Sequence, residues 1–94
     1  MTDRELNALF GLLALREGFV TKEHLLGAVD LSAASGERDL GRFLVTQRVM
    51  RASQAKAVEA LIGAFLETHG SALRAIEALA PPAALRAKLL AGDV

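Results

Sequence analysis

The sequence predicts an all-α fold, a compact bundle of five or six short helices. Apolar residues recur at the i, i+3, i+4, i+7 spacing through most of the chain, which is the pattern of amphipathic helices. Glycine or proline stands between the segments that carry this pattern. No stretch alternates apolar and polar residues over the length of a strand. With 94 residues, we expect one domain, residues 1–94, with one core.

The first predicted helical unit covers residues 2–34. Thr2 and Glu5 have the spacing of a capping box, and Gly18 is placed to end the helix that they begin. Thr21 is predicted to cap a second helix. The residues expected to face inward are Leu6, Leu9, Phe10, Leu12 and Leu13 in the first helix, and Leu25, Leu26, Val29 and Ala33 in the second.

The second predicted unit, residues 39–70, contains a short helix capped by Asp39 and a long amphipathic helix ended by Gly70. We expect the long helix to be the centre of the core, because it carries the widest apolar stripe. Gly63 in its middle predicts a close approach by a neighbouring helix. The apolar positions of the stripe are Ala57, Val58, Leu61, Ile62, Phe65 and Leu66.

Residues 71–91 are predicted to form a C-terminal helical cap. Ser71 begins one short helix, and Pro81-Pro82 stops it, because neither proline has an amide hydrogen. A last helix follows the prolines. The residues expected to pack inward are Leu73, Ile76 and Leu79 before the prolines and Leu85, Leu89 and Leu90 after them.

The two units resemble each other with a period of about 30 residues, which is typical of a repeated supersecondary unit. Gly11 corresponds to Gly41, and the apolar corner Phe19-Val20 corresponds to Val49-Met50. We interpret each unit as a helix, an apolar corner and a second helix, with the glycine allowing close helix packing. Chance similarity between leucine-rich helices is the alternative interpretation.

Composition limits the function classes. The formal net charge is zero, which argues against bulk electrostatic binding to nucleic acid or to an anionic membrane. There is no cysteine, no secretory leader pattern and no apolar run long enough for a membrane span, so we expect a cytoplasmic protein. Hydrophobic residues make up 52% of this small chain, so we expect leftover apolar surface for a protein partner or for self-association as a homo-oligomer.

No catalytic constellation is recognised, and we expect neither an enzyme nor a bound cofactor. His24 and His69 have no second ligand at the spacing of a metal site. The candidate interaction residues are four arginines around the 36–39 loop and the second corner. They are interpreted either as a phosphate or nucleic-acid contact or as a solvated face paired with Glu37 and Asp39. Because the chain has no tyrosine or tryptophan to stack on bases, nucleic acid is the weaker alternative. These arginines are Arg38, Arg42, Arg48 and Arg51.

Two segments carry a family resemblance. FGLLALREGFVTKEHLLGAV and LGRFLVTQRVMRASQAKAVEALIGAFLETHG together resemble the domain that precedes the catalytic domain in many planctomycete serine/threonine protein kinases. The resemblance extends from Leu9 to about Leu79 and includes the final pair His69-Gly70. It implies a non-catalytic regulatory module that self-associates or docks a partner, such as a kinase catalytic domain. No kinase catalytic motif is present in the chain.

The same repeat pattern is similar to the N-terminal domain of type II secretion and type IV pilus ATPases. Some of those domains bind cyclic di-GMP through two tandem Arg-Leu-Gly motifs, which gives the alternative function of a second-messenger binder. Here the two arginine positions are Leu9 and Asp39, and a corner glycine is Arg48. An aspartate would repel a phosphate, so this resemblance implies the fold more than the ligand. A small DNA-binding regulator is the third alternative.

Overall fold

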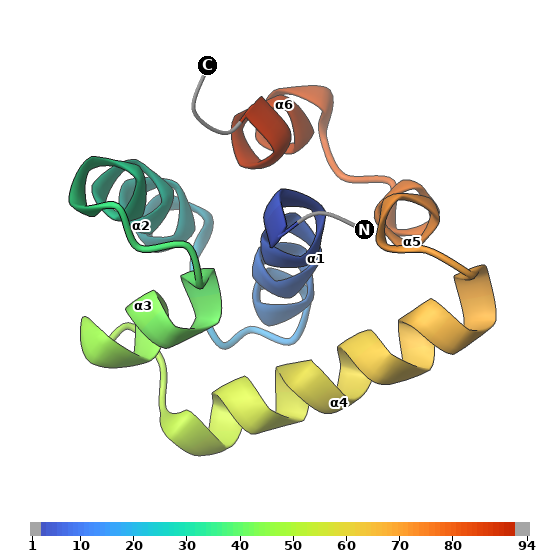
Figure 1. Ribbon diagram of the computed structural model, residues 1–94, viewed down its shortest axis with the longest axis horizontal. Coiled ribbons are helices and arrows are strands. Elements are labelled where there is room, and N and C mark those ends of the chain that lie inside the picture. Colours follow the sequence, from blue (N-terminus) through green and yellow to red (C-terminus); the bar gives the residue numbers. More distant parts are fainter. Residues whose placement is uncertain (1–2, 92–94) are drawn as a thin grey trace.

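The computed structural model describes residues 3–91, which form six helices and no strand, as predicted (Figure 1). The helices are α1 (Asp3–Arg16), α2 (Lys22–Ser35), α3 (Leu40–Thr46), α4 (Ala52–His69), α5 (Ala72–Leu79) and α6 (Ala83–Ala91). The predicted capping box at Thr2 lies outside the described residues.

The predicted helix starts are confirmed by their hydrogen bonds. The side-chain oxygens of three capping residues each accept from the backbone amide three positions on, which satisfies one donor that the helix itself leaves unpaired. These bonds are His24 N to Thr21 Oγ1 (3.1 Å), Arg42 N to Asp39 Oδ1 (3.0 Å) and Arg74 N to Ser71 Oγ (3.2 Å). Gly70 ends α4 with a φ of 84°, as its predicted role requires.

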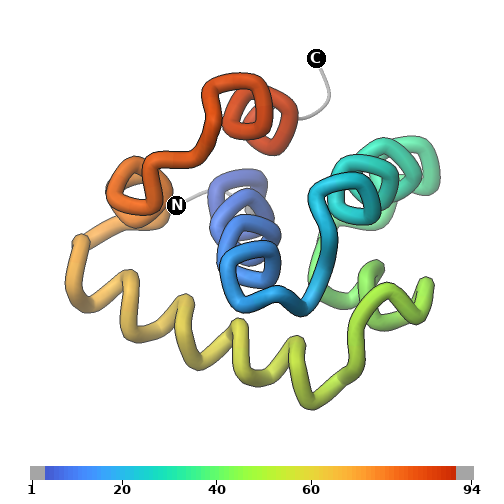
Figure 2. The backbone as a smooth tube through the Cα atoms, turned by 180° about the vertical axis from the view of Figure 1, so that it is seen from behind, coloured from blue at the N-terminus to red at the C-terminus, as the bar shows by residue number. Residues whose placement is uncertain are grey.

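α1 is the centre of the bundle. It contacts each of the other five helices, and Figures 1 and 2 show it surrounded by them in views from opposite sides. Leu9 and Leu13 are completely buried on this helix. The large side chains that other helices bury completely are Leu25, Leu44, Val58 and Ile76. The core is therefore built around the N-terminal helix.

The prediction that α4 forms the centre of the core is wrong. In this helix only Val58 is buried, whereas four large apolar residues of its stripe are half-buried. α4 lies along one side of the bundle, where it packs on α1, α3 and α5 (Figure 1). The half-buried residues, which we call the α4 apolar row, are Leu61, Ile62, Phe65 and Leu66.

Three smaller predictions about packing are also wrong. A Cβ added at Gly63 would meet no atom within 4 Å, so no neighbouring helix approaches there. Leu73 is 37% exposed, because α5 instead packs its inward face through small alanines and Ile76. Ala33 is exposed on α2, where Ala28 is the buried residue.

The internal repeat extends to the backbone. The three residues that follow α1 make the same backbone hydrogen bonds as the three that follow α3, so the two corners repeat each other in shape. The matching pairs are Glu17 N to Leu13 O with Gln47 N to Phe43 O (both 2.9 Å), and Phe19 N to Ala14 O with Val49 N to Leu44 O (both 2.9 Å). Each corner contains one left-handed residue, Gly18 with φ 77° in the first and Arg48 with φ 61° in the second.

Asn7 fastens the loop between α2 and α3 to the central helix. Its Nδ2 donates to the carbonyl of Arg38 at 2.5 Å, and its Oδ1 accepts from the amide of Leu40 at 3.1 Å. The second bond satisfies one of the free amides at the start of α3. A single side chain of the first unit thus fixes the position at which the first helix of the second unit begins.

We expect Asn7→Ala to lower the free energy of unfolding by about 1–2 kcal/mol, because it leaves a partly buried amide and a carbonyl without partners. Urea denaturation followed by circular dichroism measures this loss. Gln47→Ala is the control, since that side chain is exposed and should change stability by less than about 0.5 kcal/mol. Equal effects of the two substitutions would contradict the fastening role of Asn7.

Candidate functional site

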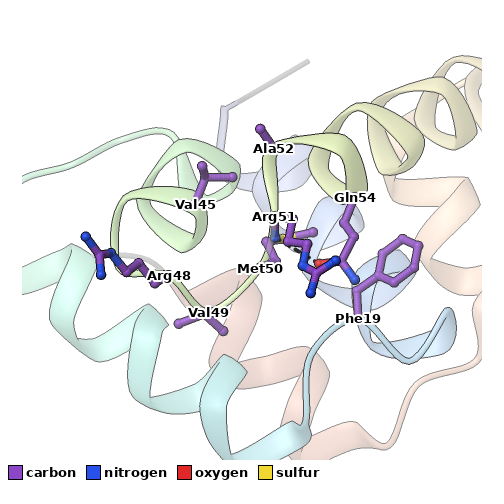
Figure 3. A pocket seen from close by; sticks show the side chains of 8 residues that line it. All are labelled: Phe19, Val45, Arg48, Val49, Met50, Arg51, Ala52 and Gln54. Carbon is purple, nitrogen blue, oxygen red and sulfur yellow. Dashed lines mark hydrogen bonds between the residues drawn. The ribbon is translucent and has the colours of Figure 1, made fainter.

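The two corners and the start of α4 enclose an open hollow of about 560 Å³, which we call the corner hollow (Figure 3). Phe19 reaches it from the first corner, and the second unit supplies the rest of the wall. Five of the eight lining residues are apolar, and the other three are two arginines and a glutamine. Its lining residues are Phe19, Val45, Arg48, Val49, Met50, Arg51, Ala52 and Gln54.

The charge of the corner hollow is positive. Arg48 and Arg51 are exposed, and no carboxylate is among the described residues that line the hollow. In Figure 3, Arg51 lies between Arg48 and Phe19, while Arg48 extends outward from the rim. The backbone amide of Arg51 donates to Oε1 of Gln54 at 2.8 Å, which holds Gln54 at the start of α4 beside the hollow. Two guanidinium groups beside apolar walls favour an anionic group with an apolar neighbour.

Arg48 occupies a conformation that side chains with a Cβ rarely adopt. Its φ of 61° costs a non-glycine residue roughly 1–2 kcal/mol, and the equivalent corner position in the first unit is Gly18. The second corner therefore carries an arginine where glycine is the unstrained choice. Strained residues of this kind cluster at functional sites.

We expect Arg48→Gly to raise the free energy of unfolding by about 0.5–1 kcal/mol, because the relief of left-handed strain exceeds the added flexibility of the unfolded chain. Gly18→Ala makes the opposite change at the equivalent position of the first corner. It should lower stability by a similar amount, although a Cβ there has open space around it. Urea midpoints measure both effects. A destabilised Arg48→Gly variant would show that the arginine side chain itself supports the fold.

The structure does not gather the four candidate arginines into one site. Arg48 and Arg51 share the corner hollow, whereas Arg38 lines a second hollow and Arg42 is exposed on α3 and lines neither. Their expected pairing with the loop carboxylates is absent among the described residues. Instead, Oε1 of Glu37 accepts from a backbone amide at 3.1 Å, and the other loop carboxylate caps α3.

The second hollow, about 430 Å³, runs between the start of α1, the α2–α3 loop and α4, and we call it the side hollow. Ile62 of the α4 apolar row forms part of its wall, beside the apolar side chains of Leu6 and Phe10. Three carboxylates and one arginine surround this apolar floor. They are Glu37, Asp39, Glu59 and Arg38.

The two residues at the positions of the ligand-binding arginines of the secretion ATPases have structural roles in this chain. Leu9 is completely buried in the core, and Asp39 caps α3. Leu9 therefore faces no open site, and Asp39 presents to the side hollow a carboxylate, which would repel a nucleotide phosphate. The tandem-motif geometry is therefore not reproduced at these two positions.

His69 lies beside an aromatic ring and a cation. Its ring centroid is 5.6 Å from that of Phe65, and the guanidinium carbon of Arg16 lies 5.1 Å from the Phe65 centroid. This stack ties the end of α1 to the end of α4, at about 0.5–1 kcal/mol for an exposed cation–π contact. Within residues 3–91, no group of three or more histidines and carboxylates is arranged to hold a metal ion.

None of the helices that the structure describes is both long enough and apolar enough to cross a membrane. Of the residues that line the corner hollow, the sequence predicts Arg48 and Arg51 as interaction candidates, and it places Phe19, Val49 and Met50 only in the apolar corners. The signal for Phe19 was its position in the repeat, since it is aromatic where the second corner has Val49.

Comparisons of the chain with protein-family models, curated proteins and solved structures give no match.

Proposed function

We propose that this chain is a non-catalytic docking module that binds a partner protein through the apolar surface along α4. The α4 apolar row is the observation that carries the proposal. Four large apolar side chains on the longest helix pack on the core but stay partly exposed, and one of them lines the side hollow. Apolar surface beside a polar rim is characteristic of protein-interaction sites.

Docking is favoured over self-association because the exposed large apolar side chains do not form one broad patch. Within the described part of the chain, the large apolar side chains classed as exposed are Leu31, at 60%, and Leu73, at 37%, which lie on different helices. A stable homodimer normally buries a broad apolar patch on each subunit. The resemblance to the domains before planctomycete kinase catalytic domains supports a kinase domain as the first partner to test.

The test is a calorimetric titration with the catalytic domain of a planctomycete serine/threonine kinase. We expect micromolar or tighter binding, and we expect Ile62→Ser to weaken it at least tenfold, because that substitution places a hydroxyl in the apolar row. Ala60→Ser on the exposed face of α4 is the matched control and should bind normally. Circular dichroism checks that both variants remain folded.

Light scattering of the chain alone, over a hundredfold range of concentration, tests the self-association form of the same proposal. A concentration-dependent dimer that Leu31→Ser abolishes would move the interface to α2. A monomer at every concentration that also fails to bind the kinase domain would contradict docking to a kinase or to itself. Tight binding of cyclic di-GMP in a calorimetric titration would instead support the second-messenger alternative.

A further inference from the structure

We propose that the corner hollow binds an extended segment of a partner protein that carries an acidic residue two positions away from a large apolar residue. This inference goes beyond the docking proposed along α4 and does not depend on it. It concerns a different surface from the α4 apolar row, because none of the four residues of that row lines the corner hollow.

The charge of the corner hollow selects an anion. Arg48 and Arg51 bring two positive charges to its rim, and no described lining residue brings a negative one. Both guanidinium groups lack a carboxylate partner within the described residues. The whole chain is neutral, so this local excess of positive charge is not a consequence of its composition. A carboxylate accepts two parallel hydrogen bonds from a guanidinium group, which gives direction as well as attraction.

The walls of the corner hollow select an apolar side chain beside that anion. Phe19, Val45 and Val49 are half-buried, so each presents part of its apolar surface to the hollow. Met50 lies at the bottom of the hollow, where it is only 4% exposed. A free phosphate or a small inorganic anion would leave these walls uncovered. A peptide side chain covers them while its neighbour pairs with Arg51.

The repeat provides an internal comparison. The first corner has the same backbone hydrogen bonds, but Gly18 stands in place of Arg48 and Thr21 in place of Arg51. Neither arginine is therefore needed to form a corner of this shape. The left-handed position of Arg48 means that an arginine there lowers the stability of the fold relative to glycine. Binding of an anion is a role that accounts for this cost.

The spacing in the partner segment follows from extended geometry. Residues i and i+2 of an extended chain point to the same side and lie roughly 6–7 Å apart. One side chain of such a pair enters the apolar hollow, while the other reaches the guanidinium groups at its rim. The open shape of the hollow suits a short segment that passes over it.

The test is a titration with a short fluorescent peptide that carries Phe and Asp two positions apart between Ser residues. The matched probe replaces the Asp with Lys, and inorganic phosphate and cyclic di-GMP are titrated in parallel. Binding is followed by anisotropy and by the methyl resonance of Met50, since the chain has two methionines and Met50 lines the hollow. We expect the acidic peptide to bind and to shift the Met50 resonance, with affinity that falls as salt is added.

Three variants separate binding from folding. Arg51→Ala should weaken the acidic peptide about tenfold. Arg48→Gly should weaken it several-fold although the variant is at least as stable as the parent protein. Arg42→Ala is the matched control, because this exposed arginine lies on neighbouring α3 and lines neither hollow, and it should leave the affinity unchanged.

Equal binding of the Lys peptide, or equal losses in Arg42→Ala and Arg51→Ala, would overturn the proposal. Tighter binding of phosphate or cyclic di-GMP than of the acidic peptide would also overturn it and would make the hollow a small-anion site. These outcomes are independent of the kinase-domain titration. Docking along α4 persists if only the peptide fails, and peptide binding persists if only the kinase domain fails.

Discussion

Leu9→Ala should lower the free energy of unfolding by about 2–5 kcal/mol, the range for removing a completely buried leucine. Its side chain lies in α1, which every other helix contacts, so the cavity cannot close by the movement of one neighbour. For a domain of this size, such a loss is a large fraction of the total stability. Urea denaturation followed by circular dichroism measures it.

Leu66→Ala in α4 is the matched control for this experiment. Leu66 is half-buried, so part of its apolar surface already faces water, and its loss should be about half that of Leu9 or smaller. If Leu66→Ala destabilises the protein as much as Leu9→Ala, then α4 forms the centre of the core and the described arrangement is wrong.

Gly41→Ala and Gly63→Ala should change stability in opposite directions. A Cβ at Gly41 would lie 2.7 Å from Cε2 of Phe10, a residue that is 6% exposed, so the ring would have to shift. Overpacking of this kind costs about 1–3 kcal/mol, which exceeds the helix-propensity gain of alanine. A Cβ at Gly63 would meet nothing, so alanine there should stabilise the protein by about 1 kcal/mol.

A double substitution tests the cause of the Gly41 effect. Phe10→Leu removes the ring atoms that the new Cβ would meet, so Gly41→Ala should cost less in that background than in the parent protein. Additive effects of the two substitutions would show that contact with Phe10 is not the reason for the glycine. A destabilised Gly63→Ala variant would show that this face of α4 is covered in solution.

The sequence predicts the helices well because their ends depend on local chemistry. Thr21, Asp39 and Ser71 act as N-caps through hydrogen bonds that reach only three residues, so no tertiary contact is needed to foresee them. Gly11 and Gly41 also behave as the repeat predicts. A Cβ at Gly11 would lie 3.0 Å from Cδ1 of Leu25 on the adjacent helix.

The apolar stripe of α4 predicts the wrong centre of the core, because a helix that is apolar around its whole surface is buried more deeply than an amphipathic one. From Ala8 to Leu15 every residue of α1 is apolar or glycine, so the helix is apolar on all sides, and such a helix belongs in the middle of a bundle. α4 has a polar outer face, which is the pattern of a helix at the surface. The signal for the correct arrangement was therefore present in the sequence.

The candidate site was only partly predictable. Arg48 and Arg51 are close in the chain, so their proximity was foreseeable, but Phe19 joins them through the packing of one corner against the other. The separation of Arg38 from this pair depends on Asn7, which holds the loop on α1. Long-range hydrogen bonds of this kind leave no periodic pattern in a sequence.

The proposed docking along α4 is tested most directly by the isoleucine methyl resonances. The chain has two isoleucines: Ile62 lies in the α4 apolar row and lines the side hollow, and Ile76 is completely buried in the core. On addition of the kinase catalytic domain, we expect the Ile62 resonance to shift strongly and the Ile76 resonance to shift little. Formation of a complex that leaves Ile62 unchanged, or that shifts the two resonances equally, would contradict docking through the α4 apolar row.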